Sequence, residues 1–201
     1  MIKRIEKLAS QALKTNPRQA RLDSQWYSLA GGWCIGLDAD FDLEPGTTAG
    51  FMAALSPLNT WESQLAYTPP NIAACLALIK SGHRAHEGIR GPGFFSNRDK
   101  AARILQGESP LDVLGGDKVR AFYRNLTGDF SVVTIDRHAL AICGWERSLT
   151  SGAYARISCA FKFAGEKFDL SGAEIQALTW SHWRRTHSAY REGVKRREAR
   201  E

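Results

Sequence analysis

The chain has 201 residues and a formal net charge of +6, which suits one compact domain and favours an anionic partner such as nucleic acid. Its four cysteines, none of them in a C-x-x-C pair, argue against zinc sites and four-cysteine iron–sulfur clusters and indicate scattered thiols in a reducing compartment. The charged N-terminus and the lack of any apolar run near about 18 residues argue against a signal peptide and a membrane segment, so we expect an intracellular, cytoplasmic protein.

The N-terminal third of the chain predicts two helices. Apolar residues recur on one face of residues 2–15, which predicts an amphipathic helix ended by Asn16 and Pro17. A second helix is predicted over residues 23–37, although its adjacent glycines are unfavourable there. Three alternating aspartates follow, and because the Gly and Glu of a calcium loop are absent, we expect a solvated turn. They are Asp38, Asp40 and Asp42.

The middle of the chain predicts three further helices. Residues 49–55 form the first, and residues 60–67 form the next. Pro69 and Pro70 are then expected to break the chain, with Asn71 capping a strongly apolar central helix over residues 72–79.

Residues 81–97 are rich in Gly, His and Arg, which predicts a basic loop. Arg90 and its neighbours could contact phosphates, or the segment could be only a solvated connection. His83 and His86 have no third ligand nearby, so no metal site is predicted.

Residues 110–114 predict a short helix that begins at a proline, and a Gly115-Gly116-Asp117 turn joins it to a helix that starts at Lys118. This is a candidate helix-hairpin-helix in which glycine N–H groups face a DNA phosphate. Asp117 brings a negative charge to that place and could instead be the N-cap of the second helix.

After the Lys118 helix, a brief extended run is predicted over residues 131–135, and Asp136 follows it directly before a helix that opens at His138. A carboxylate at this point can accept hydrogen bonds from free N–H groups at the helix start, where the helix dipole favours its charge. Asp136 is therefore either a plain N-cap or a functional acid.

The C-terminal part predicts a helix over residues 154–163 and a capping box, Ser171 with Glu174, that opens the last helix. On that helix Gln176 and Trp180 lie one turn apart. They could face a pocket, or they could be a surface Gln and a core Trp. Residues 184–201 hold seven Lys or Arg and three Glu, a composition of either a frayed solvated helix end or a nucleic-acid contact.

The order of Lys118, helix, Gly-Asp turn, apolar run and Asp136-x-His138 resembles the helix-hairpin-helix (HhH-GPD) DNA glycosylase superfamily, in a divergent form without an iron–sulfur cluster. Residues 93–105 look like the family's Gly-aromatic-aromatic-Asn-Lys-Ala segment, which packs a helix against the hairpin. Residues 51–60 are similar to its wedge helix and loop. The resemblance implies an all-α fold of about 9–10 helices with a central shortened helix-hairpin-helix and an Asp-bearing loop. The helices would form a single domain over residues 1–201, with two helical lobes and a cleft between them as the alternative.

The same resemblance implies the roles of individual residues. Asp136 would stabilise the positive charge that builds on the sugar when the base leaves, and Lys118 would attack the sugar carbon to form a Schiff base. The residues expected to contact DNA are Leu58, Asn59, Arg90, Asn97, Lys100, Gly115, Gly116, His138, Arg184 and Arg185. Weaker candidates for a base pocket are Tyr123, Gln176 and Trp180.

Three functions remain open at this point. The first is a glycosylase acting on a flipped-out damaged or modified base in double-stranded DNA, either monofunctional or with Lys-mediated AP lyase activity that also cuts the strand. It would act as a monomer without a metal or cofactor, in the cytoplasm or nucleoid of a bacterium or phage-infected cell. The second is a phage-type DNA hypermodification enzyme on the same scaffold, of the amino-acid:DNA transferase or pyrophosphorylase-like kind. The third is a noncatalytic DNA-binding protein in which Asp136 is only a cap.

Overall fold

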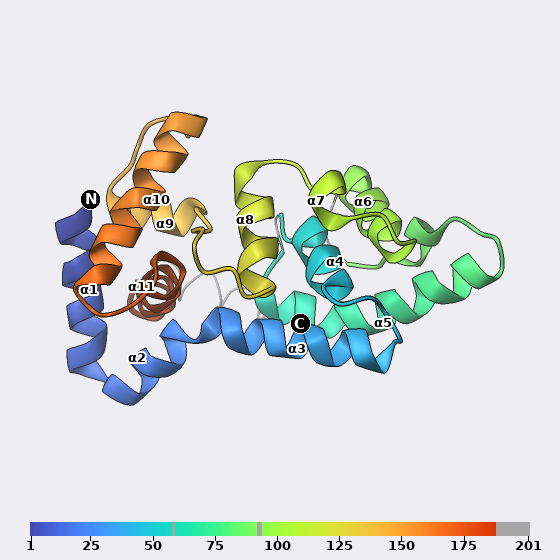
Figure 1. Cartoon of the computed structure of the whole chain (residues 1–201), viewed down its shortest axis with the longest axis horizontal. Coiled ribbons are helices and arrows are strands. Elements are labelled where there is room, and N and C mark those ends of the chain that lie inside the picture. Colours follow the sequence, from blue (N-terminus) through green and yellow to red (C-terminus); the bar gives the residue numbers. More distant parts are fainter. Residues whose placement is uncertain (58, 92–93, 188–201) are drawn as a thin grey trace. The chain divides into compact units, whose positions relative to one another are not determined.

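The structure of the protein, a computed structural model, describes residues 1–57, 59–91 and 94–187 (Figure 1). These residues form eleven α-helices and one short 3-10 helix and contain no β-strand, which confirms the all-α prediction. In chain order they are α1 (Ile2–Thr15), α2 (Pro17–Ser24), α3 (Trp26–Asp40), α4 (Thr47–Leu55), α5 (Trp61–Lys80), η1 (Ala85–Gly88), α6 (Phe95–Leu105), α7 (Pro110–Val113), α8 (Asp117–Leu126), α9 (Arg137–Cys143), α10 (Ser151–Glu166) and α11 (Gly172–Thr186). None of the helices in these ranges is long and apolar enough to cross a membrane.

The chain divides into two compact units. Unit 1 combines Met1–Leu29 with the segment from Asp129 onward, and unit 2 is the continuous segment Ala30–Gly128. Helix α3 begins in unit 1 and continues into unit 2. Each unit has its own helices and its own buried side chains, and each is described by itself below.

Unit 1 packs the N-terminal helices α1 and α2 against α10 and α11, the last helices of the described chain. In Figure 1 the blue helices α1 and α2 lie beside the orange and red helices α10 and α11. The predicted amphipathic helix α1 is confirmed, and its apolar face is buried as the helical period requires. The largest core side chains of this unit are Ile5, Ile135, Ile157, Phe161, Ile175 and Leu178.

The predicted second helix, residues 23–37, is in fact two helices that meet at Gln25. The first of them starts earlier because Asn16 caps it: the Oδ1 atom of Asn16 accepts from the backbone N–H of Gln19 at 3.0 Å. Pro17 occupies the first helical position, where its missing N–H costs nothing. The Asn16-Pro17 pair therefore ends α1, as predicted, and also starts α2.

The predicted break at Pro69 and Pro70 is wrong, since both prolines lie inside the single helix α5. Its buried residues keep one helical face through the prolines: Gln64, Thr68, Asn71, Ile72 and Cys75. A break would turn part of this face toward solvent, so burial outweighs the roughly 3 kcal/mol that an interior proline costs. Asn71, predicted as a cap, instead bonds the backbone of Arg90.

Packing requires a glycine at one of the two adjacent glycine positions of α3. A Cβ atom on Gly31 would overlap the backbone carbonyl oxygen of Leu126 in α8, whereas a Cβ atom on Gly32 would meet nothing within 4 Å. Gly31 therefore allows α3 and α8 to approach closely inside unit 2, and Gly32 points to open space.

The expectation of a solvated acidic turn is wrong for Asp38. Its side chain is buried, and its two carboxylate oxygens each accept a backbone N–H at 2.7 Å, from Gly46 and from Thr48. These N–H groups belong to the start of α4, which has no side-chain cap from its own N-cap residue. Asp38 thus caps α4 from the end of α3, while Asp40 and Asp42 are not buried.

The two helices of the candidate hairpin are present in unit 2 as α7 and α8, joined by residues 114–116. Gly116 is the N-cap of α8 and has a φ of 79°, a backbone conformation that favours glycine, so Asp117 is the first helical residue rather than the cap. The Arg120 side chain folds back and donates from Nε to the carbonyl of Leu114 at 2.8 Å. A side chain of α8 therefore fixes the connection between α7 and α8.

Candidate functional site

Asp136 stands at the N-terminus of α9 with three donors on its carboxylate. Oδ1 accepts from the backbone N–H of His138 at 3.0 Å and of Ala139 at 2.8 Å, which confirms the predicted N-cap. Oδ2 accepts from the indole Nε1 of Trp180 at 3.1 Å. The side chain is half-buried, so one part of the carboxylate is held by backbone and the other by α11.

The loop that presents Asp136, residues 131–135, belongs to no helix, and no strand in the described part of the chain pairs with it. Tyr154 of α10 takes the place of such a partner. Its hydroxyl donates to the carbonyl of Val133 at 2.8 Å and accepts from the N–H of Ile135 at 3.1 Å. One hydroxyl group therefore satisfies two backbone groups and fixes the loop just before Asp136.

Trp180 lies at the centre of an aromatic cluster around Asp136. Its ring centroid is 5.7 Å from that of Trp26 and 6.3 Å from that of His138. The guanidinium carbon of Arg184 lies over the Trp180 ring at 4.5 Å, a cation–π contact. All four side chains are half-buried, so the cluster borders solvent and combines flat rings, a cation and a carboxylate.

Gln176 lies one turn before Trp180 on α11 and is only 3% exposed, so the expectation of a surface Gln is wrong. Its Oε1 atom accepts from the hydroxyl of Tyr27 at 2.8 Å, the partner that a buried amide needs. Burial raises the pKa of Tyr27 well above its ordinary value, and the nearby Asp136 charge adds to this, whereas a hydrogen bond with Thr134 opposes it. The Tyr27 hydroxyl is therefore a neutral donor beside the Asp136 loop.

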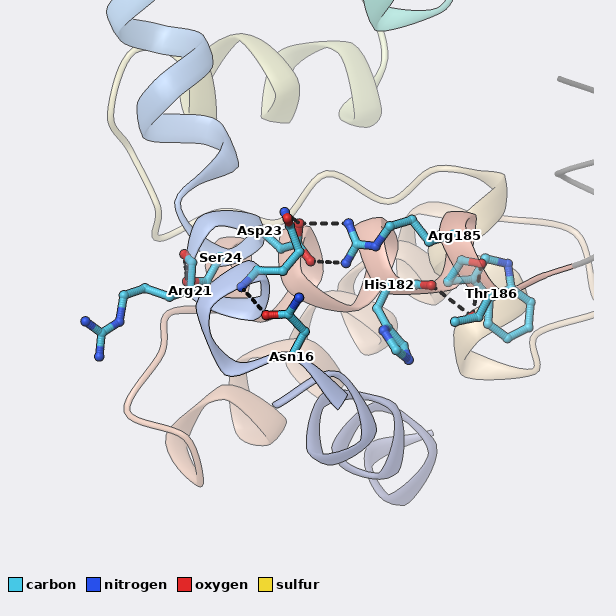
Figure 2. Close-up of polar contacts among 9 residues, drawn as sticks. Asn16, Arg21, Asp23, Ser24, His182, Arg185 and Thr186 are labelled. Atoms are coloured by element: carbon cyan, nitrogen blue, oxygen red, sulfur yellow. Dashed lines mark hydrogen bonds and ion pairs between the residues drawn. The ribbon is translucent and has the colours of Figure 1, made fainter. Parts of the chain in front are cut away.

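Arg185, expected to contact DNA, is bound within unit 1. Figure 2 shows its guanidinium pointing at Asp23: Nη1 donates to Oδ1 at 2.9 Å and Nη2 donates to Oδ2. The amide of Gln19 adds a third donor to the buried Asp23 carboxylate. The neighbouring His182 has its pKa lowered by burial and by Arg185, although Asp23 acts in the opposite direction. The positive charge of Arg185 is thus balanced inside the unit, which leaves Arg184 as the arginine at the aromatic cluster.

Three of the predicted DNA contacts, Gly115, Gly116 and Lys100, lie together at the connection between α7 and α8 in unit 2. Gly115 and Gly116 are exposed, and the Nζ atom of Lys100 lies 3.6 Å from the position that a Cβ would take on Gly115. Lys118 is the second residue of α8 and is half-buried. Lys118 therefore belongs to the hairpin of unit 2, and Asp136 belongs to unit 1.

Comparison with known proteins places the whole of this architecture in one family. Residues 1–187 match a family described as a family of unknown function, DUF7178. The chain belongs to the DUF7178 family. No curated protein and no solved structure matches it.

The other predicted site residues of the DUF7178 chain are scattered over unit 2. Tyr123 of α8 lies against Gly46, and burial, followed by the charge of Asp38, raises its pKa. Asn59 has a buried Oδ1 atom that accepts no hydrogen bond from any described residue. Leu58 lies outside the described residues, and so do residues 188–201 of the basic tail.

Two further predicted DNA contacts, Arg90 and Asn97, flank the loop before α6. Arg90 is exposed and donates to the carbonyl of Glu87 at 3.1 Å, and Asn97 lies in the first turn of α6. Among the described residues of the DUF7178 chain, no group of three or more His, Cys, Asp or Glu side chains is arranged to hold a metal ion.

Proposed function

We propose that the chain is a DNA glycosylase-like enzyme that acts on a flipped-out damaged or modified base in double-stranded DNA and cleaves its N-glycosidic bond. The observation that supports this is the Asp136 carboxylate, oriented by three donors at the edge of a half-buried aromatic cluster. Its place of action would be the cytoplasm or nucleoid, and it would work as a monomer.

The chemistry needs an oriented carboxylate. Cleavage of the base–sugar bond builds positive charge on the sugar, which a fixed negative charge stabilises more in the transition state than in the ground state. A carboxylate can accept about four hydrogen bonds, and the Asp136 carboxylate accepts three from groups of the same chain. One position is left to face a sugar or an attacking water, and the bound geometry needs little rearrangement during the reaction.

An extruded base needs a surface on which to stack. The Trp26 and Trp180 rings of unit 1 border solvent next to Asp136 and offer such a surface. Arg184 over Trp180 adds a cation for the neighbouring phosphate. Gln176 takes no part in base contact under this proposal, because Tyr27 occupies its carbonyl in the interior.

Strand scission by Lys118 is a second part of the proposal, and its support is the spacing of Lys118 and Asp136 along the sequence. An amine that attacks the sugar carbon leaves a Schiff base that borohydride reduces to a stable covalent complex. Trapping of the wild type and loss of trapping in Lys118→Gln is the expected result. If base release persists without any trapped complex, the enzyme is monofunctional.

The test of the main proposal is base release from a panel of duplexes, each carrying one damaged or modified base. We expect Asp136→Asn to lower turnover roughly a hundredfold or more while DNA affinity is retained. Asp169→Asn is the matched control, because Asp169 is exposed in the same unit and its positive φ of 54° is also accessible to Asn. Equal turnover of both variants would refute a catalytic role for Asp136.

A noncatalytic DNA-binding protein is the second candidate, and a specific observation favours it: both bonds to Oδ1 are those of an ordinary N-cap. In that case no duplex in the panel loses a base, and Asp136→Asn changes only stability. Intact strands that carry an altered base would instead indicate hypermodification chemistry.

A further inference from the structure

Unit 2 exposes three aromatic rings around one loop. Phe94 is 59% exposed, Phe95 is 67% exposed and Tyr67 is 42% exposed. Resemblance to the glycosylases implied that the segment beginning at Gly93 packs a helix against the hairpin. Helix α6 does bury Ala101, Ala102, Ile104 and Leu105, but the two phenylalanines at its start remain in solvent. Large rings left in water at adjacent positions are characteristic of a binding surface.

Two residues before these phenylalanines, Arg90 and Gly91, are fixed by contacts with α5. The Asn71 side chain donates to the carbonyl of Arg90 at 3.0 Å and accepts from its N–H at 2.8 Å. Gly91 follows with a φ of 93°, and a Cβ there would lie 3.2 Å from the Tyr67 ring, so the backbone packs directly on this ring. His86 meets Phe95 edge to face at 4.9 Å between ring centroids. The rings of Tyr67 and Phe95 thus have packing partners before any ligand binds, which lowers the entropic cost of binding.

Positive charge surrounds the rings. Residues 80–100 contain five Lys or Arg and two acidic residues, Glu87 and Asp99. Arg98 donates from Nη2 to the carbonyl of Gly91 at 2.8 Å, and Arg90 donates from Nη1 to the carbonyl of Glu87 at 3.1 Å. Bonds to carbonyl groups orient both guanidiniums without cancelling their charge, so further N–H donors remain for an anion.

An apolar groove of about 670 Å³ adjoins the same loop. Tyr67, Ala74 and Leu78 of α5 line it together with Arg90, and Glu87 is the acidic residue in its lining. The groove therefore offers flat apolar contact with an arginine at its edge. Flat rings, an apolar groove and oriented guanidiniums match a ligand that has flat apolar faces and a regularly spaced negative charge.

We infer that Tyr67, Arg90, Phe94, Phe95 and Arg98, here named the aromatic surface, bind single-stranded nucleic acid. Unpaired bases stack on the rings, which every base can do, and the two guanidiniums contact the phosphates. Paired bases in a duplex present only their edges, so duplex DNA lacks the exposed faces that these rings need. The surface lies wholly in unit 2 and does not include Asp136, so it shares with the proposed excision activity only the nucleic-acid partner.

The test is fluorescence anisotropy of the full chain with a labelled oligothymidine of about 20 nucleotides and with a duplex of the same length. We expect Phe94→Ala together with Phe95→Ala to weaken oligothymidine binding about tenfold or more, and duplex binding far less. Phe163→Ala is the matched control, because Phe163 is 58% exposed in unit 1 and should leave both affinities unchanged.

Two further variants test the phosphate contact and the base stacking separately. Arg98→Gln should weaken binding of the oligothymidine and reduce its salt dependence by about one released counterion, since a phosphate contact is lost. Phe95→Trp should retain binding, and its fluorescence should be quenched by the stacked base. The Asp136→Asn variant should bind the oligothymidine like the wild type. Failure of the proposed excision activity can therefore be told apart from failure of oligothymidine binding.

The outcomes are distinct. Unchanged oligothymidine affinity in the double phenylalanine variant, or an equal loss in Phe163→Ala, overturns the inference. Because both phenylalanines are exposed, the thermal midpoint of the double variant should match that of the wild type, which confirms that any loss reflects binding.

Discussion

The indole N–H of Trp180 donates to Oδ2 of Asp136 at 3.1 Å, so helix α11 holds the free side of a carboxylate whose other oxygen caps α9. An N-cap needs only one oxygen, and the second would ordinarily face solvent. Its use by a tryptophan, itself packed against Trp26, gives the carboxylate one orientation. The proposed excision chemistry requires a carboxylate held in one orientation.

Replacing Trp180 by Phe keeps a ring in the cluster and removes the donor. A hydrogen bond to a charged group contributes about 1.5–3 kcal/mol, so we expect base release to slow roughly tenfold to a hundredfold. Single-turnover assays measure this rate. Trp183→Phe is the control, since Trp183 lies on the same helix and stacks on His187 instead. An unchanged rate for Trp180→Phe would mean that the hydrogen bond has no catalytic role.

Tyr154→Phe should destabilise the loop of unit 1. The variant leaves the carbonyl of Val133 and the N–H of Ile135 without their hydroxyl partner, at a cost of about 1–3 kcal/mol. Urea denaturation measures the change in the free energy of unfolding. The exposed Tyr67 provides a comparison, and Tyr67→Phe should fall within about 0.5 kcal/mol of the wild type.

The two glycines of α3 should respond in opposite directions to alanine. Gly31→Ala places a methyl group on the Leu126 carbonyl and should destabilise by about 1–3 kcal/mol. Gly32→Ala meets nothing and should stabilise by about 0.5–1 kcal/mol, because alanine is the better helix former. Thermal unfolding of both variants checks the sign, and a stabilised Gly31→Ala would contradict the close approach of α3 and α8.

Asp38→Ala should be far more costly than Asp40→Ala. The first removes the acceptor of two backbone N–H groups at the start of α4, one buried and one part-buried, a loss of about 2–4 kcal/mol, whereas Asp40 is exposed. Chemical denaturation again measures the difference. Similar stabilities would show that Asp38 does not cap α4.

Thiol labelling should distinguish one cysteine from three. Burial raises the pKa of Cys34 to about 12 and the pKa of Cys75 and Cys143 to about 11, while Cys159 is exposed. A thiol with a pKa near 11 is only ~0.1% thiolate at pH 8, so it reacts slowly even where reagent can reach it. An aromatic disulfide reagent at pH 8 should therefore modify one thiol rapidly, and Cys159→Ser should abolish this phase. Labelling of all four in denaturant is the control.

Features that depend on neighbouring residues could be predicted from the sequence. The capping box of Ser171 and Glu174 was predicted from a spacing of three residues, and both of its hydrogen bonds are present. The amphipathic period of α1 and the cap at Asp136 were likewise predicted from neighbouring residues. Each of these features depends on contacts within one turn or one helix face.

Features that depend on contacts between distant segments of the chain could not be predicted from the sequence. Pro69 and Pro70 are strong local breakers, but the buried face of α5 keeps the helix continuous. The burial of Gln176 depends on Tyr27, which lies 149 positions earlier, and no local pattern indicates that pairing. Tyr154 gave no signal either, since it acts on a loop about twenty positions away. Only the apolar neighbours of Gln176 on α11 could have suggested an interior position.

The division of the chain into units sets an order for synthesis. Unit 2 is one uninterrupted stretch, Ala30–Gly128, inserted between the two halves of unit 1. A ribosome therefore delivers all of unit 2 before α9, α10 and α11 exist, and domains generally fold as they emerge. Meanwhile the apolar face of α1, with Ile5 and Ala9, must wait for the partners that bury it. The apolar face of α1 is therefore without its α10 and α11 partners throughout the synthesis of unit 2.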